Sequence, residues 1–281
     1  MTIEIVKEKY FEILKDIVSI PSPSSDEAKL AKHLIDKYEG SDWIGDKDEI
    51  HNLYFHRKDD KETETLPLLL AHLDTHLNGK STENNRKLRE KDFLSFTNGK
   101  VRKKYNIQAG FDDKAGVAAI LYLMQNTDLK FRAIFVTQEE ETKNPSYERL
   151  GGGGIDQALK KYSDVFDKSS YVISLDRENH NDIIIEYGIK DHPKKYRIPL
   201  CDEEFTKLII KCSKDAGYLM EVSDKGRMAD VYNIRRQYFN LNCVNLSCGI
   251  YNEHNPCESL EIDETINVMK VVKKCLGSRL S

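Results

Sequence analysis

Residues 68–76 read Leu68-Leu69-Leu70-Ala71-His72-Leu73-Asp74-Thr75-His76. A continuous apolar run of this length predicts a strand that is buried on both faces of a sheet. The run ends abruptly in side chains that carry nitrogen and oxygen. In an open α/β sheet the functional crevice lies at the carboxyl ends of the strands, so this ending predicts a strand that delivers side chains to a reaction centre.

Helix and strand patterns alternate through the rest of the chain. Apolar patterns predict helices over residues 1–20, 117–124, 203–215 and 263–276. A further helix is expected from an N-cap at Ser24 or Ser25 to about residue 38, and another from the glycines 151–154 to about residue 162. Alternating or continuous apolar runs predict strands over 49–56, 66–73, 92–96, 131–135, 171–175 and 239–246. Asn98-Gly99 predicts a tight turn between two short strands. Residues 78–91 and 141–150 are expected to be loops.

This alternation predicts an α/β fold with a mixed, mostly parallel central sheet and helices on both faces. No internal repeat, low-complexity tract or interdomain linker stands out in the sequence. We therefore expect residues 1–281 to form a single domain.

Composition narrows the classes of partner. The chain has 281 residues, 39% of them hydrophobic, and a formal net charge of −4. Its lysines are spread among acidic residues, so we expect no nucleic-acid partner. Residues 1–20 carry charges between their apolar positions, so we expect neither a signal peptide nor a membrane span. The six cysteines form no C-x-x-C pair, which favours reduced thiols in a cytoplasmic protein.

Polar residues with ligand atoms recur at the predicted strand ends and in the adjoining loops. They are His72, Asp74, Asp112, Glu139, Glu140, Asp176 and His254. Because the carboxyl ends of parallel strands meet at one edge of a sheet, these side chains can converge although they are far apart in sequence. Two imidazoles with three or more carboxylates suit a site for two divalent metal ions, and zinc accepts this nitrogen and oxygen set.

The same residues lie in motifs that resemble those of a known family. The motifs are His72-x-Asp74-Thr75, Gly110-Phe111-Asp112-Asp113-Lys114-Ala115-Gly116, Glu139-Glu140, Ser174-Leu175-Asp176 and residues 245–254, which end in Tyr251-Asn252-Glu253-His254. In this order they resemble the di-zinc exopeptidases, which include tripeptidase T and related zinc aminopeptidases. The resemblance extends over residues 5–276 and implies the three-layer α/β/α sandwich of those enzymes.

The resemblance also implies a role for each ligand. Asp112 would bridge two divalent metal ions, most simply Zn²⁺, with Co²⁺ or Mn²⁺ as alternatives. His72 and Asp176 would complete one metal site, and Glu140 and His254 would complete the other.

Two further residues would act on these ligands and on the substrate. Asp74 would orient the imidazole of His72, and Glu139 would be the general base that takes a proton from the attacking water. Since three glutamates are consecutive, a second alignment is open, in which Glu140 is the base and Glu141 is the ligand.

The sequence departs from this family in two places. Relatives of the tripeptidase type carry a lid and dimerisation domain after the aspartate ligand, whereas here only residues 177–200 precede the next helix. We therefore expect a catalytic domain without a lid. The substrate contacts of a lid would then be absent, come from another subunit, or be replaced by loops, for which residues 78–91 and 141–150 are the candidates. The segment Gly226-Arg227-Met228-Ala229-Asp230 lacks the glycine pair of relatives, and Asp230 is expected either to face a substrate amine or to be an N-cap or surface residue.

The glycines 151–154 are expected to form a flexible turn or, alternatively, an anion site at a helix N-terminus.

These expectations lead to three functional hypotheses. The first is a cytoplasmic, metal-dependent aminopeptidase that cleaves short peptides. The second keeps the metal-dependent hydrolysis but assigns an N-acyl amino acid as the substrate, as in a deacylase. The third is a non-catalytic metal-binding module. The sequence leaves the oligomeric state open.

Overall fold

The computed structural model describes residues 2–61, 63–76, 82–97, 100–140, 153–188, 197–223, 226 and 229–278. The helices are α1 (Ile3–Val18), α2 (Ala28–Tyr38), α3 (Thr82–Leu88), α4 (Phe111–Asn126), α5 (Gly153–Lys161), α6 (Ser163–Asp167), α7 (Glu203–Asp215), α8 (Asp230–Gln237) and α9 (Ile262–Leu276). The strands are β1 (Trp43–Lys47), β2 (Leu53–Arg57), β3 (Leu66–His72), β4 (Leu94–Thr97), β5 (Lys100–Lys103), β6 (Arg132–Val136), β7 (Ser169–Glu178), β8 (Asp182–Ile184), β9 (Glu186–Gly188), β10 (Arg197–Pro199), β11 (Glu221–Ser223), β12 (Cys243–Tyr251) and β13 (Ser259–Leu260).

A mixed sheet runs through the middle of the molecule. Its strands lie in the order β1-β2-β6-β3-β7-β12-β8-β11, and β13 pairs with the end of β12. The four central strands β6, β3, β7 and β12 are mutually parallel, whereas β1 and β2 add an antiparallel edge. The expected α/β architecture with a mixed, mostly parallel central sheet is confirmed.

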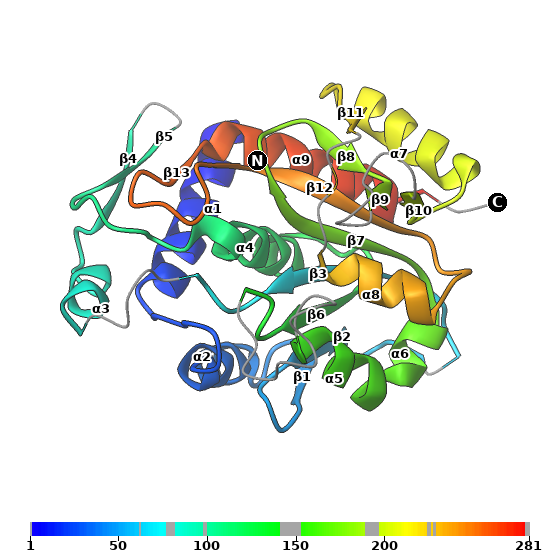
Figure 1. Cartoon of the computed structure of the whole chain (residues 1–281), viewed down its shortest axis with the longest axis horizontal. Helices are drawn as coiled ribbons and strands as arrows, with labels where there is room; N and C mark the ends of the chain where they lie inside the picture. The colour runs from blue at the N-terminus through cyan, green and yellow to red at the C-terminus, as the bar shows by residue number, and fades with distance from the viewer. Residues whose placement is uncertain are drawn as a thin grey trace.

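Helices cover both faces of this sheet (Figure 1). Along β3, Leu69 and Ala71 belong to one hydrophobic cluster, together with side chains of α1, α2, α4, α7 and α9. Leu68 and Leu70 belong to a second cluster, together with side chains of α5, α6 and α8. Since successive side chains of a strand point to opposite faces, the unbroken apolar run of β3 supplies both clusters at once.

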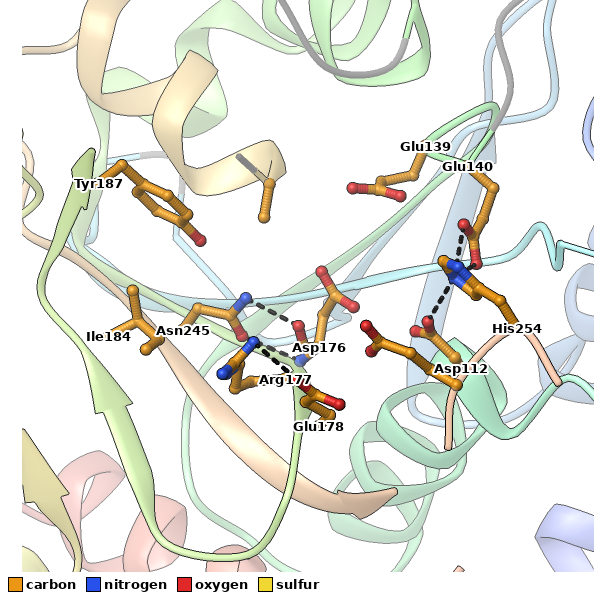
Figure 2. Close-up of a pocket in the computed structure, with 12 residues that line it drawn as sticks. Asp112, Glu139, Glu140, Asp176, Arg177, Glu178, Ile184, Tyr187, Asn245 and His254 are labelled. Carbon is orange, nitrogen blue, oxygen red and sulfur yellow. Dashed lines mark hydrogen bonds and ion pairs between the residues drawn. The ribbon is translucent and has the colours of Figure 1, made fainter. Parts of the chain in front are cut away.

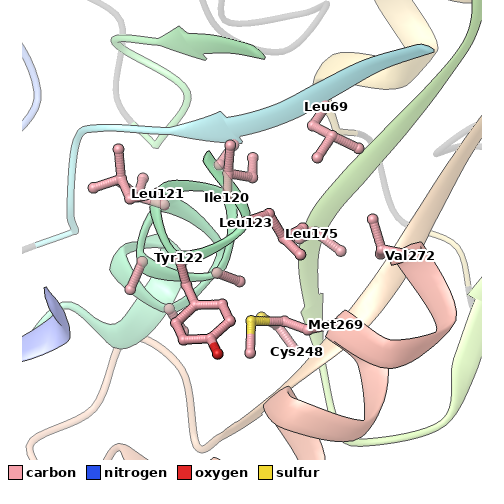
Figure 3. Close-up of a cluster of buried hydrophobic side chains, with 14 of the residues drawn as sticks. Leu69, Ile120, Leu121, Tyr122, Leu123, Leu175, Cys248, Met269 and Val272 are labelled. Atoms are coloured by element: carbon pink, nitrogen blue, oxygen red, sulfur yellow. The ribbon is translucent and has the colours of Figure 1, made fainter. Parts of the chain in front are cut away.

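Helix α4 is enclosed on every side. Every residue from Phe111 to Met124 is buried, which is expected of a helix that is apolar all round. Figure 3 shows Ile120 and Leu123 of this helix beside Leu69 of β3 and Leu175 of β7, within the larger hydrophobic cluster. Among the described residues no helix, α4 included, is long and apolar enough to cross a membrane.

Three expectations for the first third of the chain are wrong. The N-cap position of α2 is Glu27, not Ser24 or Ser25, because the Ser24 hydroxyl donates to the Asp74 carboxylate instead. The strand expected over 49–56 begins at Leu53, since the carboxylate of Asp48 accepts the N–H groups of Ile50 and Asn52 and forms a turn. The loop expected over 78–91 contains helix α3.

Two expected strand ends also shift. Strand β7 does not end at Asp176 but continues to Glu178, because it pairs with β12 beyond an irregular register. The strand expected over 239–246 is β12, which begins at Cys243, after an exposed Phe239, and continues to Tyr251 through its pairing with β13. The expected turn at residues 98–99 lies outside the described residues, and so do 77–81 and 141–152.

Candidate metal centre and active site

Four neighbouring strands deliver polar side chains to one edge of the sheet. β3 ends in His72, Glu139 and Glu140 follow β6, Asp176 lies near the end of β7, and His254 follows β12. Because these strands are parallel, their carboxyl ends lie together. Helix α4 begins at the same edge and adds Asp112 (Figure 2).

The structure brings all five residues predicted as metal ligands into two overlapping groups. One group contains His72, Asp112 and Asp176, and the other contains Asp112, Glu140 and His254, with the candidate ligand atoms of each group within 4.8 Å of one another. Asp112 belongs to both groups. Its Oδ1 lies 3.4 Å from Nε2 of His72, and its Oδ2 lies 3.1 Å from Nε2 of His254.

Asp74 holds the imidazole of His72 from behind. Nδ1 of His72 lies 2.9 Å from the backbone oxygen of Asp74 and 3.5 Å from its Oδ1. Nδ1 therefore donates to Asp74, and Nε2 is the nitrogen that faces Asp112 and Asp176. Burial raises the pKa of Asp74, but the neighbouring imidazole and hydrogen bonds outweigh it and hold that pKa below its usual value.

Asp74 also orders the start of the glutamate run. Its Oδ1 accepts the backbone N–H of Glu139 at 3.0 Å, and its Oδ2 accepts that of Glu140 at 3.1 Å. Gln138, with φ +56°, turns the chain sharply at the end of β6, so that these two N–H groups face Asp74. One buried carboxylate thus fixes both a candidate ligand and its neighbour.

Two acidic residues without a role in the sequence prediction support the segment around Asp112. The carboxylate of Glu258 accepts the backbone N–H groups of Ala109, Gly110 and Asp112 at 2.9–3.2 Å. Asp113 accepts the backbone N–H of His72 at 3.2 Å. Asp113 lies inside the quoted motif, whereas Glu258 carries no local signal because its partners are about 150 positions away in the chain.

Negative charge is crowded in the site, and the pKa values reflect it. Burial and the Asp112 carboxylate raise the pKa of Glu140 to about 7, and burial likewise raises the pKa of Asp176. Hydrogen bonds to Asp112 and Glu140 raise the pKa of His254 to about 11. Such mutual repulsion among buried carboxylates is relieved when a cation lies between them.

The donor set fits a divalent metal ion. Three carboxylates and two imidazoles converge, and all of their candidate ligand atoms are oxygen or nitrogen. These are ligands that zinc and the other first-row divalent ions bind. A carboxylate behind a ligating imidazole, as Asp74 lies behind His72, is the usual support of such a ligand.

Glu139 lies beside the two groups, on a cavity of about 160 Å³. Figure 2 shows its carboxylate on the cavity side of the chain, near Glu140. Burial, followed by repulsion from Asp176, Asp230 and Glu140, raises the pKa of this carboxyl well above its usual value, with His72 opposing the shift. Glu141, the ligand in the second alignment, lies outside the described residues.

Several residues of the cavity wall were not singled out from the sequence. They include Arg177, Glu178 and Tyr187, together with Asn245 and Glu253, which lie in the quoted motif of residues 245–254 without an assigned role. His76 is a further neighbour, since its ring centroid lies 4.8 Å from that of His254. Arg177 and Glu178 directly follow the predicted ligand Asp176, and this position was the signal in the sequence that could have identified them.

Asp230 is buried at the start of α8 and is neither the N-cap, which is Ala229, nor a surface residue. Burial, with repulsion from Asp176 and Asp74, raises its pKa well above the usual value. Ala229, rather than Asp230, lines the cavity. Residues 227 and 228 and the first two glycines of 151–154 lie outside the described residues.

The fold is similar to that of solved structures of two aminopeptidases and a dipeptidase. No protein-family model matches the chain, and no curated protein matches it significantly. Among solved structures, aminopeptidase PepT from Bacillus cereus superposes with a TM-score of 0.72 at 14% identity, covering 96% of this chain and 98% of that one. An aminopeptidase from the archaeon Desulfurococcus kamchatkensis gives 0.69 at 13% identity, covering 97% and 96%. The aminoacylhistidine dipeptidase from Vibrio alginolyticus gives 0.68 at 10% identity, covering 96% of each chain.

These similarities extend over nearly the whole chain and confirm, for the fold, the resemblance to the tripeptidase and aminopeptidase structures. At identities of 10–14% they speak for the fold alone. The function has to be argued from the side chains at the sheet edge.

Proposed function

We propose that this protein is a metal-dependent aminopeptidase that removes N-terminal residues from short peptides. The observation that carries the proposal is the pair of ligand groups that share Asp112, with the Glu139 carboxylate beside them on one cavity. A non-catalytic metal-binding module has no use for such a carboxylate. The fold shared with peptidases raises the expectation further, as an analogy.

Two divalent ions, most simply Zn²⁺, would be held by His72, Asp112 and Asp176 and by Asp112, Glu140 and His254. Bound there, they would polarise the scissile carbonyl and make the attacking water more acidic.

Glu139 is the general base in this proposal. It takes the proton from the attacking water and returns it to the leaving amine. Asp74 positions His72 through Nδ1 and positions Glu139 through its backbone N–H. The Glu139/Glu140 assignment is favoured over Glu140/Glu141, because it is Glu140 that contacts His254 at 2.9 Å.

A free amine suits the cavity better than a blocked one. Beyond the ligands and Glu139, the wall carries the carboxylates of Glu178 and Glu253, which can attract an ammonium group. We further propose that the chain is a single catalytic domain without a lid.

The test uses the purified protein with added Zn²⁺, Co²⁺ or Mn²⁺, Ala-Ala-Ala, its N-acetylated form and N-acetylalanine, with products identified by mass spectrometry. We expect release of N-terminal alanine from the free peptide only. Glu139→Gln should reduce kcat at least about 100-fold while keeping its metal, since general-base catalysis contributes about 10² to 10⁴. Glu140→Gln should also lose bound metal, measured by elemental analysis.

Glu204→Gln, on the exposed face of α7, is the matched control and should behave as the parent. Hydrolysis by both Glu139→Gln and Glu140→Gln at the parental rate would refute the proposal. Cleavage of the N-acetylated compounds alone would establish a deacylase instead.

A further inference from the structure

Arg177 is a buried cation in a strongly acidic cavity. Its exposed fraction is 8%. Arg177 is the only lysine or arginine among the described residues that line this cavity (Figure 2). The carboxylates around it belong to Asp112, Glu139, Glu140, Asp176, Glu178 and Glu253.

An irregularity of the sheet aims Arg177 at the cavity. In a regular strand, successive side chains point to opposite faces, so Asp176 and Arg177 would not share a cavity. Here the pairing of β7 with β12 changes register between Asn245 and Ser247 and again before Ile250. Such irregularities redirect side chains beside functional sites, and Asp176 and Arg177 both line the wall.

The hydrogen-bonding capacity of Arg177 is only partly used. Its terminal nitrogens form ion pairs at 3.5 Å with Glu178 and Asp182. Its buried Nε has no hydrogen-bond partner among the residues that the structure describes. A guanidinium offers five N–H donors in a planar fork, and a buried donor without a partner needs an explanation.

We propose that Arg177 binds a carboxylate of the substrate and thereby sets the specificity of the site; the proposal rests on the peptidase function proposed above. A carboxylate matches the guanidinium fork in a two-point hydrogen bond, which an amide cannot do as strongly. In this wall of acidic groups, a substrate carboxylate is held only where a cation meets it.

The position of Arg177 relative to the ligands limits which carboxylate it can reach. Arg177 follows Asp176 directly, and both line the same cavity of about 160 Å³. A residue of extended peptide spans about 3.5 Å, so a carboxylate held in this cavity belongs to a residue within one or two positions of the bond to be cleaved. The carboxylate is either the C-terminus of a di- or tripeptide or an acidic side chain beside that bond.

Substrate pairs that differ only in one carboxylate test this role. The first pair is Ala-Ala and Ala-Ala-amide, and the second is Glu-Ala-amide and Gln-Ala-amide, compared for the metal-loaded parent and for Arg177→Met. We expect Arg177→Met to lower kcat/KM about 10- to 100-fold more for the carboxylate member of one pair than for its amide member, mainly through KM. This range corresponds to a charge-assisted hydrogen bond. The pair that responds identifies the source of the carboxylate.

Two further variants and a binding measurement separate recognition from structure. Arg177→Lys keeps the charge but not the fork and should lie between Arg177→Met and the parent. Arg132→Met removes another buried arginine, which lies away from this cavity and whose Nε has an ion-pair partner, Asp60, but no hydrogen-bond partner among the described residues. This variant should affect both members of each pair equally. In Glu139→Gln, calorimetry should show tighter binding of the carboxylate member, and adding Arg177→Met should abolish the difference.

Equal losses for both members of each pair, or no loss at all, would overturn the role of Arg177. If the parent cleaves neither member of either pair, the peptidase proposal itself fails. The two failures are therefore distinguishable.

Discussion

Glu27 lies behind the site and connects the N-terminal segment to the glutamate run. It is buried, with an exposed fraction of 1%. Its Oε1 accepts the backbone N–H of Ser25 at 2.8 Å and that of Gln138 at 3.1 Å. Burial, followed by repulsion from Asp74, raises the pKa of this carboxyl to about 7.

This raised pKa makes stability depend on pH. In the unfolded chain Glu27 loses its proton near its ordinary pKa of 4.5, whereas in the folded protein it keeps the proton up to about pH 7. Between these values the folded state binds more protons, so the contribution of Glu27 to stability falls as pH rises from about 4.5 to 7.

We therefore expect Glu27→Gln to gain stability relative to the parent as pH increases from 5 to 8. The gain should be on the order of 3 kcal/mol, at about 1.4 kcal/mol per pKa unit. Urea denaturation of both proteins at several pH values measures it. Any change in the two backbone hydrogen bonds is independent of pH and cancels in the comparison. A stability difference that stays constant with pH would contradict the assignment.

Single residues were predictable from the sequence where a local pattern marked them. His72, Asp176 and the glutamate pair follow apolar runs, and it was their common position at strand ends, in a consistent order along the chain, that marked them. Tyr187 and Glu258 had no such mark. Their places in the site depend on the antiparallel pairing of β9 with β10 and on hydrogen bonds across the fold, which no local pattern encodes.

At the scale of elements, the contact of α4 with β7 fixes the position of Asp112. Gly116 lies in the second turn of α4. A Cβ built at Gly116 would collide with the carbonyl oxygen of Leu175 in β7 and with the carboxylate of Asp113. Only glycine allows the helix to lie this close to the strand.

Gly116→Ala should therefore destabilise the protein by about 3 kcal/mol, as overpacking does, despite the better helix propensity of alanine. The control is Gly277→Ala at the end of α9, where the nearest atom to a new Cβ is 3.5 Å away and φ is −83°. The control should change the free energy of unfolding by less than about 1 kcal/mol. Urea midpoints measure both, and equal midpoints for Gly116→Ala and the parent would disprove the close contact.

Elements were predictable where one pattern ran through them. The long helices α1, α4, α7 and α9 and the buried strands β3 and β6 have clear periods or continuous apolar runs. The edge strand β1 was missed because only Trp43 of its five residues is buried, so its sequence does not alternate. The short strands β8 to β11 have three residues each, which is too short for a period.

At the scale of the whole molecule, the site exists only in the folded chain. Its candidate ligands lie between positions 72 and 254 and arrive from four strands and one helix. Their order in sequence made the set recognisable, but their distances depend on the strand order β6-β3-β7-β12. A metal ion that needs all of these elements cannot bind the unfolded chain in the same way.

Metal binding should therefore stabilise the fold as a whole. At a free Zn²⁺ concentration 100-fold above Kd, the gain is about 2.7 kcal/mol, and we expect Tm to rise by about 5 °C and to fall again with a chelator. Asp112→Asn, which alters the residue shared by both groups, should lose the Zn²⁺-induced rise. His254→Ala should keep part of it, since the group of His72, Asp112 and Asp176 is intact. Asp164→Asn, on the exposed side of α6, should respond as the parent.

Elemental analysis measures how many metal ions each protein binds. It should give two metal ions per chain for the parent, one for His254→Ala and fewer than one for Asp112→Asn. An unchanged rise in Asp112→Asn would mean that the ion binds elsewhere.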